Sequence, residues 1–155
     1  MRLTTYTDYS IRVLIRLALN PQQLTTIASI AEIYDISEHH LMKVVHQLGI
    51  AGYVETVRGR GGGLRLAMKP SAIKIGQVVR RMESDFDLVA CFRGPKACAI
   101  APACLVASAF EEALKAFMAV LDRYTLADVV RKPRKLCGLL GIPVETERLR
   151  LRRAS

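Results

Sequence analysis

The sequence contains no run of about 18 consecutive apolar residues, the length that a membrane-spanning helix needs. No hydrophobic segment of the kind found in secretory signals follows Arg2. We therefore expect a soluble protein of the cytoplasm. Its 155 residues, of which 51% are hydrophobic, suffice for one domain, or for a small head with an oligomerisation element, which excludes global disorder.

The usual signatures of enzyme sites are missing as well. There is no Cys-x-x-Cys pair of a thiol oxidoreductase, and no pair of side chains suggests acid–base catalysis. The one cluster of glycines is not followed by Lys-Ser or Lys-Thr, and its spacing does not fit the dinucleotide fingerprint. We therefore predict that the protein is not an enzyme.

Acidic residues are scarce, because 14 Asp and Glu stand against 23 Lys and Arg, which gives a net charge of +9. The excess is unevenly distributed. Residues 1–82 and residues 131–155 each carry a net charge of +6, whereas residues 83–130 carry −3. Two basic segments around an acidic one favour a surface that binds a polyanion, and a solvated basic surface without a partner is the alternative.

Apolar spacing in the first half of the chain predicts three helices. The first runs from about Thr7 to Leu19 and the second from Thr26 to Tyr34, and Ser37 caps the third. Two short helices joined by a three-residue turn form the helix-turn-helix pattern, whose second helix enters the major groove of DNA. That helix has an apolar stripe at Leu41, Val44, Val45 and Leu48. Its polar side carries the candidate DNA contacts Ser37, His39, His40, Lys43, His46 and Gln47.

A glycine-rich hairpin follows these helices. Residues 52–57 and 64–66 are predicted strands, and residues 58–63 form a basic turn between them. Glycines allow the backbone of the turn to approach DNA, and Arg58, Arg60 and Arg65 can contact phosphates or the minor groove. The chain is therefore predicted to be mainly α with a small β wing, a winged helix-turn-helix head followed by a long helix.

Three of the four cysteines, Cys91, Cys98 and Cys104, lie in a segment whose glycine and prolines argue against regular structure. Structural zinc usually takes ligand pairs about two to four residues apart, whereas iron–sulfur clusters accept thiolates at variable spacing. The spacing favours a cluster, and zinc, a thiol redox switch and simple packing are the alternatives. Cys137 is expected to be unligated, and the histidines lack the i, i+4 spacing of a metal pair.

The last long helix carries an apolar stripe in steps of four and three residues: Ala103, Ala107, Phe110, Leu114, Phe117, Leu121 and Tyr124. This seam of about three heptads predicts a dimer arm, and docking of the helix on the head is the alternative. Two-fold symmetry predicts a palindromic operator in double-stranded DNA, with half-sites about one helical turn apart. Beyond Arg131 the proline-interrupted basic sequence predicts a mobile tail, or else an ordered strap against the dimer.

Several motifs follow one another in a specific order along residues 1–130. They are Thr7-Asp8-Tyr9, the segment Ile36–Val45, Ala51-Gly52-Tyr53-Val54, Gly62–Leu66, the three cysteines, and Tyr124–Val129. Through them the chain resembles the small winged-helix iron–sulfur repressors of transcription, and among these the nitric-oxide sensors most closely. Their relatives that regulate cluster biogenesis are expected to carry a histidine just after the third cysteine. Here Leu105-Val106-Ala107 follows, and no histidine occurs beyond His46.

The resemblance implies that Cys91, Cys98 and Cys104 ligate the cluster and that Asp8, supplied by the partner subunit, is the fourth ligand. Judged from the residues alone, Asp8 is also explained by a capping arrangement with Thr5 and by the preference for acids in a first helical turn. We expect a 4Fe–4S rather than a 2Fe–2S cluster.

Together these expectations divide the chain into a DNA-binding head (1–82), a cluster-binding loop (83–104), a dimerisation helix (105–130) and a basic tail (131–155). We predict a homodimeric repressor that leaves its operator when nitric oxide reacts with the cluster and breaks the bridge between subunits. A repressor that senses oxidation or iron status through the same cysteines is the main alternative. An RNA or architectural DNA binder without sequence discrimination is another.

Overall fold

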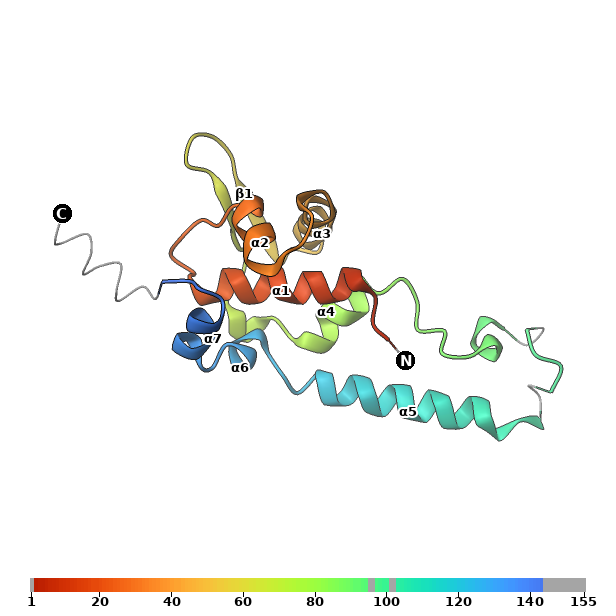
Figure 1. The fold of residues 1–155 in the computed structure, drawn as a ribbon. Coiled ribbons are helices and arrows are strands. Elements are labelled where there is room, and N and C mark those ends of the chain that lie inside the picture. Colours follow the sequence, from red (N-terminus) through yellow and green to blue (C-terminus); the bar gives the residue numbers. More distant parts are fainter. Residues whose placement is uncertain (1, 95–96, 101–102, 144–155) are drawn as a thin grey trace, which may run out of the picture.

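The computed structural model describes residues 2–94, 97–100 and 103–143. Four helices and a two-stranded hairpin form a head, and two short helices close it at one end (Figure 1). From the head, residues 83–94 lead away to one side, and a long helix brings the chain back (Figure 1). The predicted architecture, mainly helical with a small wing, is confirmed. No helix in the described ranges is long and apolar enough to cross a membrane.

Helix α1 (Thr5–Leu19) lies at the centre of the head and buries Val13, Leu14 and Leu17 almost completely. Its N-cap is Thr4, whose hydroxyl oxygen accepts a hydrogen bond from the Thr7 N–H at 3.3 Å. The capping arrangement predicted between Thr5 and Asp8 is therefore wrong. Asp8 instead accepts a hydrogen bond from Arg12, four residues further along the helix.

The helix-turn-helix consists of α2 (Ile27–Tyr34) and α3 (Glu38–Ile50). Asp35 ends α2 in the left-handed region, with φ of 52°, and so turns the chain towards α3. The predicted stripe of α3 is confirmed, because Leu41, Val44, Val45 and Leu48 are all buried in the main core. Ser37 stands at the N-cap as predicted, although its side chain makes no capping hydrogen bond.

The wing consists of strands β1 (Val54–Val57) and β2 (Gly63–Leu66), paired antiparallel with Val54 opposite Leu66 and Val57 opposite Gly63. A bridge between Thr25 and Leu64 ties the second strand to the segment before α2. At Gly62 an added Cβ would lie 2.3 Å from the carbonyl oxygen of Val57, so the turn accepts only glycine there.

Helix α5 (Leu105–Leu121) packs on α4 (Ile75–Met82) through a small second core of Ile75, Val79 and Met118. Leu114, Phe117 and Leu121 of the predicted stripe flank this core, so three of the seven stripe residues face the head. Met118, which lies off the stripe, is the one buried residue of α5, with 7% of its surface exposed. The short helix η1 (Pro70–Ala72) precedes α4.

Two short helices complete the head, α6 (Leu126–Val129) and α7 (Pro133–Leu139). Helix α6 begins at a full capping box between Thr125 and Asp128. For residues 131–143 the structure differs from the predicted mobile tail. Cys137 and Ile142 are buried against Leu19, because apolar residues spaced along α7 cover the end of α1. Residues 144–155 lie outside the described residues.

The junction of α4 with the end of α5 leaves no space for a side chain at position 76. A Cβ on Gly76 would lie 2.1 Å from the Asp122 Oδ1 and 3.1 Å from the Asp122 backbone nitrogen. Arg80 donates two hydrogen bonds of 2.7 Å to the same carboxylate, and these bonds lower the pKa of Asp122.

Replacing Gly76 with alanine is therefore expected to push the Asp122 carboxylate away from Arg80. We expect the free energy of unfolding to fall by about 1–3 kcal/mol, the usual cost of overpacking. Thermal denaturation checks this. Gly138→Ala in α7 is the matched control, since nothing lies within 4 Å of its Cβ position, and it should leave stability unchanged or raise it. Equal melting temperatures for the two variants would contradict the tight junction.

Candidate functional site

The polar side of α3 forms an exposed surface, here called the reading face. All six predicted DNA-contacting residues of this helix are solvent-exposed: Ser37, His39, His40, Lys43, His46 and Gln47. The opposite side of α3 is anchored in the core by Leu41 and Leu48, both at 0% exposure. The face is thus held on a rigid support, as a helix that enters a DNA groove requires.

The wing projects on the same side of the head as α3, away from α5 (Figure 1). Its three predicted contacts, Arg58, Arg60 and Arg65, are exposed. Arg65 forms an ion pair with Glu55 directly across the two strands. Arg58 and Arg60, on the turn itself, make no ion pair with any residue that the structure describes.

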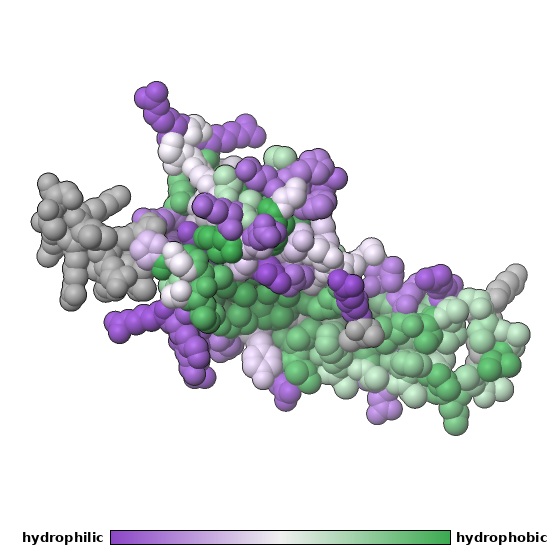
Figure 2. All heavy atoms as spheres, in the orientation of Figure 1, coloured by the Kyte–Doolittle hydropathy of each residue, from purple (hydrophilic) through white to green (hydrophobic). Residues whose placement is uncertain are grey.

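Hydrophilic side chains gather over the wing and the upper part of the head, whereas hydrophobic ones line the side of α5 and the loop (Figure 2). On α5 and just beyond it the exposed apolar residues include Leu105, Val106, Phe110, Val120 and Tyr124, here called the apolar strip. Phe110 and Tyr124 were predicted members of the dimer seam. Exposed apolar side chains gathered on one element are a candidate surface for association.

The three loop cysteines lie outside the packed head. Cys91 is part of the short helix η2 (Ala90–Arg93), Cys98 follows in irregular chain, and Cys104 is the N-cap of α5. All three are free thiols of intermediate exposure. Cys104 directly precedes a helix of 17 residues.

In the part of the chain that the structure describes, no three His, Cys, Asp or Glu side chains converge closely enough to hold a metal ion. The structure therefore does not bring the predicted ligands of one chain together. The donor chemistry nevertheless suits iron–sulfur ligation, because the loop offers three accessible thiols and soft thiolates are the ligands such clusters take.

Asp8, the predicted fourth ligand, lies on the exposed side of the first turn of α1 with half of its side chain accessible. It borders a pocket of about 480 Å³ together with Arg2, Tyr9, Arg12 and Tyr34, among others. Arg12 donates to the Asp8 carboxylate at 2.9 Å and lies 5.6 Å from the centre of the Tyr34 ring. The carboxylate thus faces solvent, where a second subunit can reach it.

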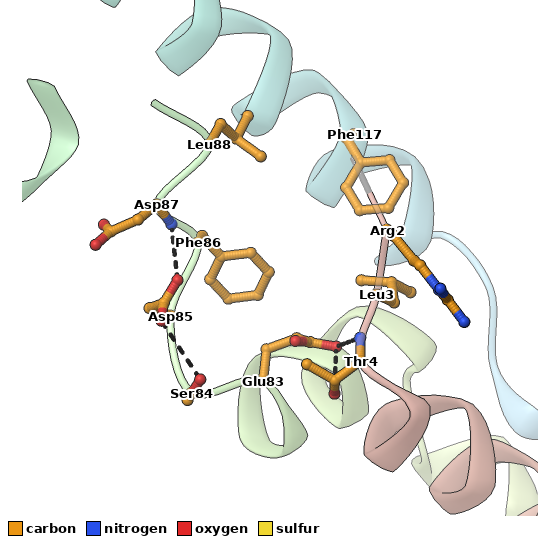
Figure 3. A pocket seen from close by; sticks show the side chains of 10 residues that line it. All are labelled: Arg2, Leu3, Thr4, Glu83, Ser84, Asp85, Phe86, Asp87, Leu88 and Phe117. Atoms are coloured by element: carbon orange, nitrogen blue, oxygen red, sulfur yellow. Dashed lines mark hydrogen bonds between the residues drawn. The ribbon is translucent and has the colours of Figure 1, made fainter. Parts of the chain in front are cut away.

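Sequence reasoning missed a contact at the base of the loop. Glu83 accepts hydrogen bonds from the Thr4 N–H at 2.8 Å and from the Thr4 hydroxyl at 3.1 Å. The two residues line a pocket between the start of α1, the loop and Phe117 of α5 (Figure 3). A single glutamate after a helix gives no sequence signal, so no motif could have indicated this contact.

A second contact that was missed joins α1 to the recognition helix. The Tyr6 hydroxyl donates a hydrogen bond of 2.8 Å to the carbonyl oxygen of Lys43. Burial raises the pKa of Tyr6 above its ordinary value.

Comparison with known proteins gives consistent results. A profile of the Rrf2 family, described as iron-dependent transcriptional regulators, matches residues 3–132. The HTH-type transcriptional regulator NsrR of Bacillus subtilis (strain 168) is 54% identical over 142 residues, which cover 90% of this chain and 97% of the relative. NsrR of Geobacillus kaustophilus (strain HTA426) is 49% identical, with the same two coverages.

Solved structures share the fold. IscR of T. potens superposes with a TM-score of 0.68 at 30% identity and covers 84% of this chain and 87% of its own. CymR, the global cysteine regulator of B. subtilis, has the same TM-score and identity over 84% of this chain and 97% of its own. Regulators with different names thus share one fold, so the fold alone does not identify the signal to which this chain responds.

Proposed function

The chain belongs to the Rrf2 family of transcriptional regulators, and from that premise we propose that it is a homodimeric cytoplasmic repressor released from a palindromic operator by nitric oxide. Like its named relatives, it is a DNA-binding regulator with a winged head. It is not an enzyme. One observation carries the finer proposal. The 54% identity with a protein named NsrR extends over 142 residues, well beyond the 82 residues of the head, and so into the loop and α5.

We propose that Cys91, Cys98 and Cys104 hold an iron–sulfur cluster, with Asp8 of the partner subunit as the fourth ligand and 4Fe–4S as the cluster type. When bound, the cluster supplies iron that reacts with nitric oxide. The accessibility of the three thiols supports this assignment, and so does the exposure of Asp8 at the edge of an open pocket. A ligand set drawn from two chains would link the loop of one subunit to the head of the other.

The residues of α5 supply the second part of the proposal. Its apolar strip is the surface through which we propose that two chains associate. The end of α5 is fixed to the head by the Met118 core and by the Arg80–Asp122 ion pair. The spacing of two reading faces would therefore follow the packing of two α5 helices, as half-sites on one operator require.

The test is anaerobic purification followed by a visible spectrum, iron and sulfide per chain, and binding to an operator selected from random DNA. We expect coloured protein with matching iron and sulfide, nanomolar-range binding typical of specific regulators, and bleaching with loss of binding on nitric oxide addition. Colourless protein that releases DNA upon thiol oxidation would replace this proposal with an oxidation sensor. Binding without sequence discrimination would leave only a general nucleic-acid binder.

A further inference from the structure

The first turn of α1, residues 4–8, lies between the loop and the recognition helix. At one end Thr4 contacts Glu83, the first residue of the cluster-binding loop. At the other end Asp8 faces the solvent. Between them Tyr6 reaches α3. The contacts of this turn therefore connect two regions with different proposed roles.

Tyr6 is placed to fix the position of α3 relative to α1. Its ring packs against the main core, and its hydroxyl donates to the Lys43 carbonyl oxygen at 2.8 Å. A carbonyl oxygen has two lone pairs, so it can accept this bond beside its helical one. Lys43 is in the middle of α3, and its side chain is exposed on the reading face. The bond thus ends on the backbone that carries a proposed DNA contact.

Glu83 connects the same turn to the loop. It directly follows α4 as the C-cap residue, and its carboxylate accepts from both the N–H and the hydroxyl of Thr4 (Figure 3). Thr4 in turn caps α1 through its contact with the Thr7 N–H. A displacement at the start of the loop therefore acts on the cap of α1, less than one helical turn from Tyr6.

We propose that this first turn couples the loop to the recognition helix, and that the Tyr6 hydroxyl is the positioning group that transmits the state of the loop to the reading face. The inference rests on the proposed function and adds a residue to it. Tyr6 touches neither the thiols nor DNA in this scheme. It acts by holding the backbone of α3 at Lys43, so its effect is a coupling between two sites rather than binding at either.

The test is Tyr6→Phe, which keeps the ring and removes only the hydroxyl. Operator affinity is measured by fluorescence anisotropy for cluster-loaded protein and for protein stripped by a chelator. We expect the ratio of the two affinities to fall about threefold to tenfold, as the loss of one hydrogen bond allows. The affinity of the stripped form and the visible spectrum of the loaded form should not change.

Tyr53→Phe is the matched control. Tyr53 packs in the same core, and its hydroxyl makes no hydrogen bond with a described residue, so its affinity ratio should equal that of the wild type. An equal loss in both forms of Tyr6→Phe would give Tyr6 a structural role only and overturn the inference, as would an unchanged ratio. A wild-type ratio of one would instead overturn the proposed function, and the inference with it.

A double-mutant cycle with Glu83→Ala, which removes the accepting oxygens, tests whether the two contacts act in series. Loss of either contact should interrupt the same link, so the double variant should lower the affinity ratio no further than the more severe single variant. Multiplied effects of the two changes would show two independent contacts and contradict a coupling through residues 4–8.

Discussion

Replacing Cys98 with serine is expected to give a colourless protein that keeps its fold and loses its response to nitric oxide. A serine hydroxyl stays protonated at neutral pH and is a poor ligand for iron, whereas a thiolate is a soft and charged one. Cys98 lies in irregular chain outside the packed cores, so the head should melt at the same temperature as in the stripped wild type. Operator affinity should fall to that of the stripped wild type. A loss of about fivefold to 150-fold is expected, since this corresponds to the coupling free energy of about 1–3 kcal/mol that is typical of two linked sites.

Iron and sulfide per chain, the visible spectrum and operator binding before and after nitric oxide measure this result. Cys137→Ala is the control, because that thiol is buried in the head at 1% exposure and is not an expected ligand. It should keep the cluster and the response while losing some stability. A Cys98→Ser protein with full iron content and full response would remove Cys98 from the ligand set.

Replacing Phe110 with glutamate is expected to separate the dimer. Phe110 is 39% exposed on the apolar strip and belongs to none of the described cores, so the head does not depend on it. In a two-fold interface each strip meets its own copy, and the change places two like charges in an apolar contact. A monomer has only one reading face, so operator affinity should fall by about 100-fold or more, within the span that separates specific from non-specific binding.

Sedimentation should give the mass of one 17.2 kDa chain for Phe110→Glu and twice that mass for the wild type. Ala119→Glu is the matched control, because nine residues along α5 turn the helix by about half a revolution and place position 119 on the opposite, exposed side. It adds the same charge to the same helix and should leave the dimer intact. A dimeric Phe110→Glu protein with full operator affinity would move the interface elsewhere.

The helix-turn-helix was predictable because its local periodicity reports burial directly. Leu41, Val44, Val45 and Leu48 repeat at helical spacing, and all four lie in the core. Apolar spacing was a poorer guide to burial on α5, because Met118, its buried residue, does not belong to the predicted heptad stripe. Which side of that helix faces the head depends on the position of α4, and this is a tertiary property. Helix α7 was not predicted, because Pro133 and the basic residues around it are typical of a mobile tail and the apolar pattern in this segment is short.

For the site, exposure was easier to predict than contact. The reading face is exposed because the buried stripe of α3 lies on the opposite side, and the wing arginines are exposed as their polar pattern predicts. The contacts of Thr4 with Glu83 and of Tyr6 with Lys43 join residues 79 and 37 positions apart. No window of local sequence contains both partners, so only the folded chain reveals them.

The four thiols differ in their access to solvent, because Cys137 on α7 is buried and the three loop cysteines are not. Burial raises the pKa of Cys137, against an opposing effect of the Arg16 charge, and its sulfur is shielded from solvent. A thiolate is the reactive form of cysteine, so a buried and protonated thiol is inert to small electrophiles and oxidants. The three accessible thiols all lie on one loop. Thiol reagents should therefore modify this loop, which we propose to control DNA binding, before they reach the packed interior.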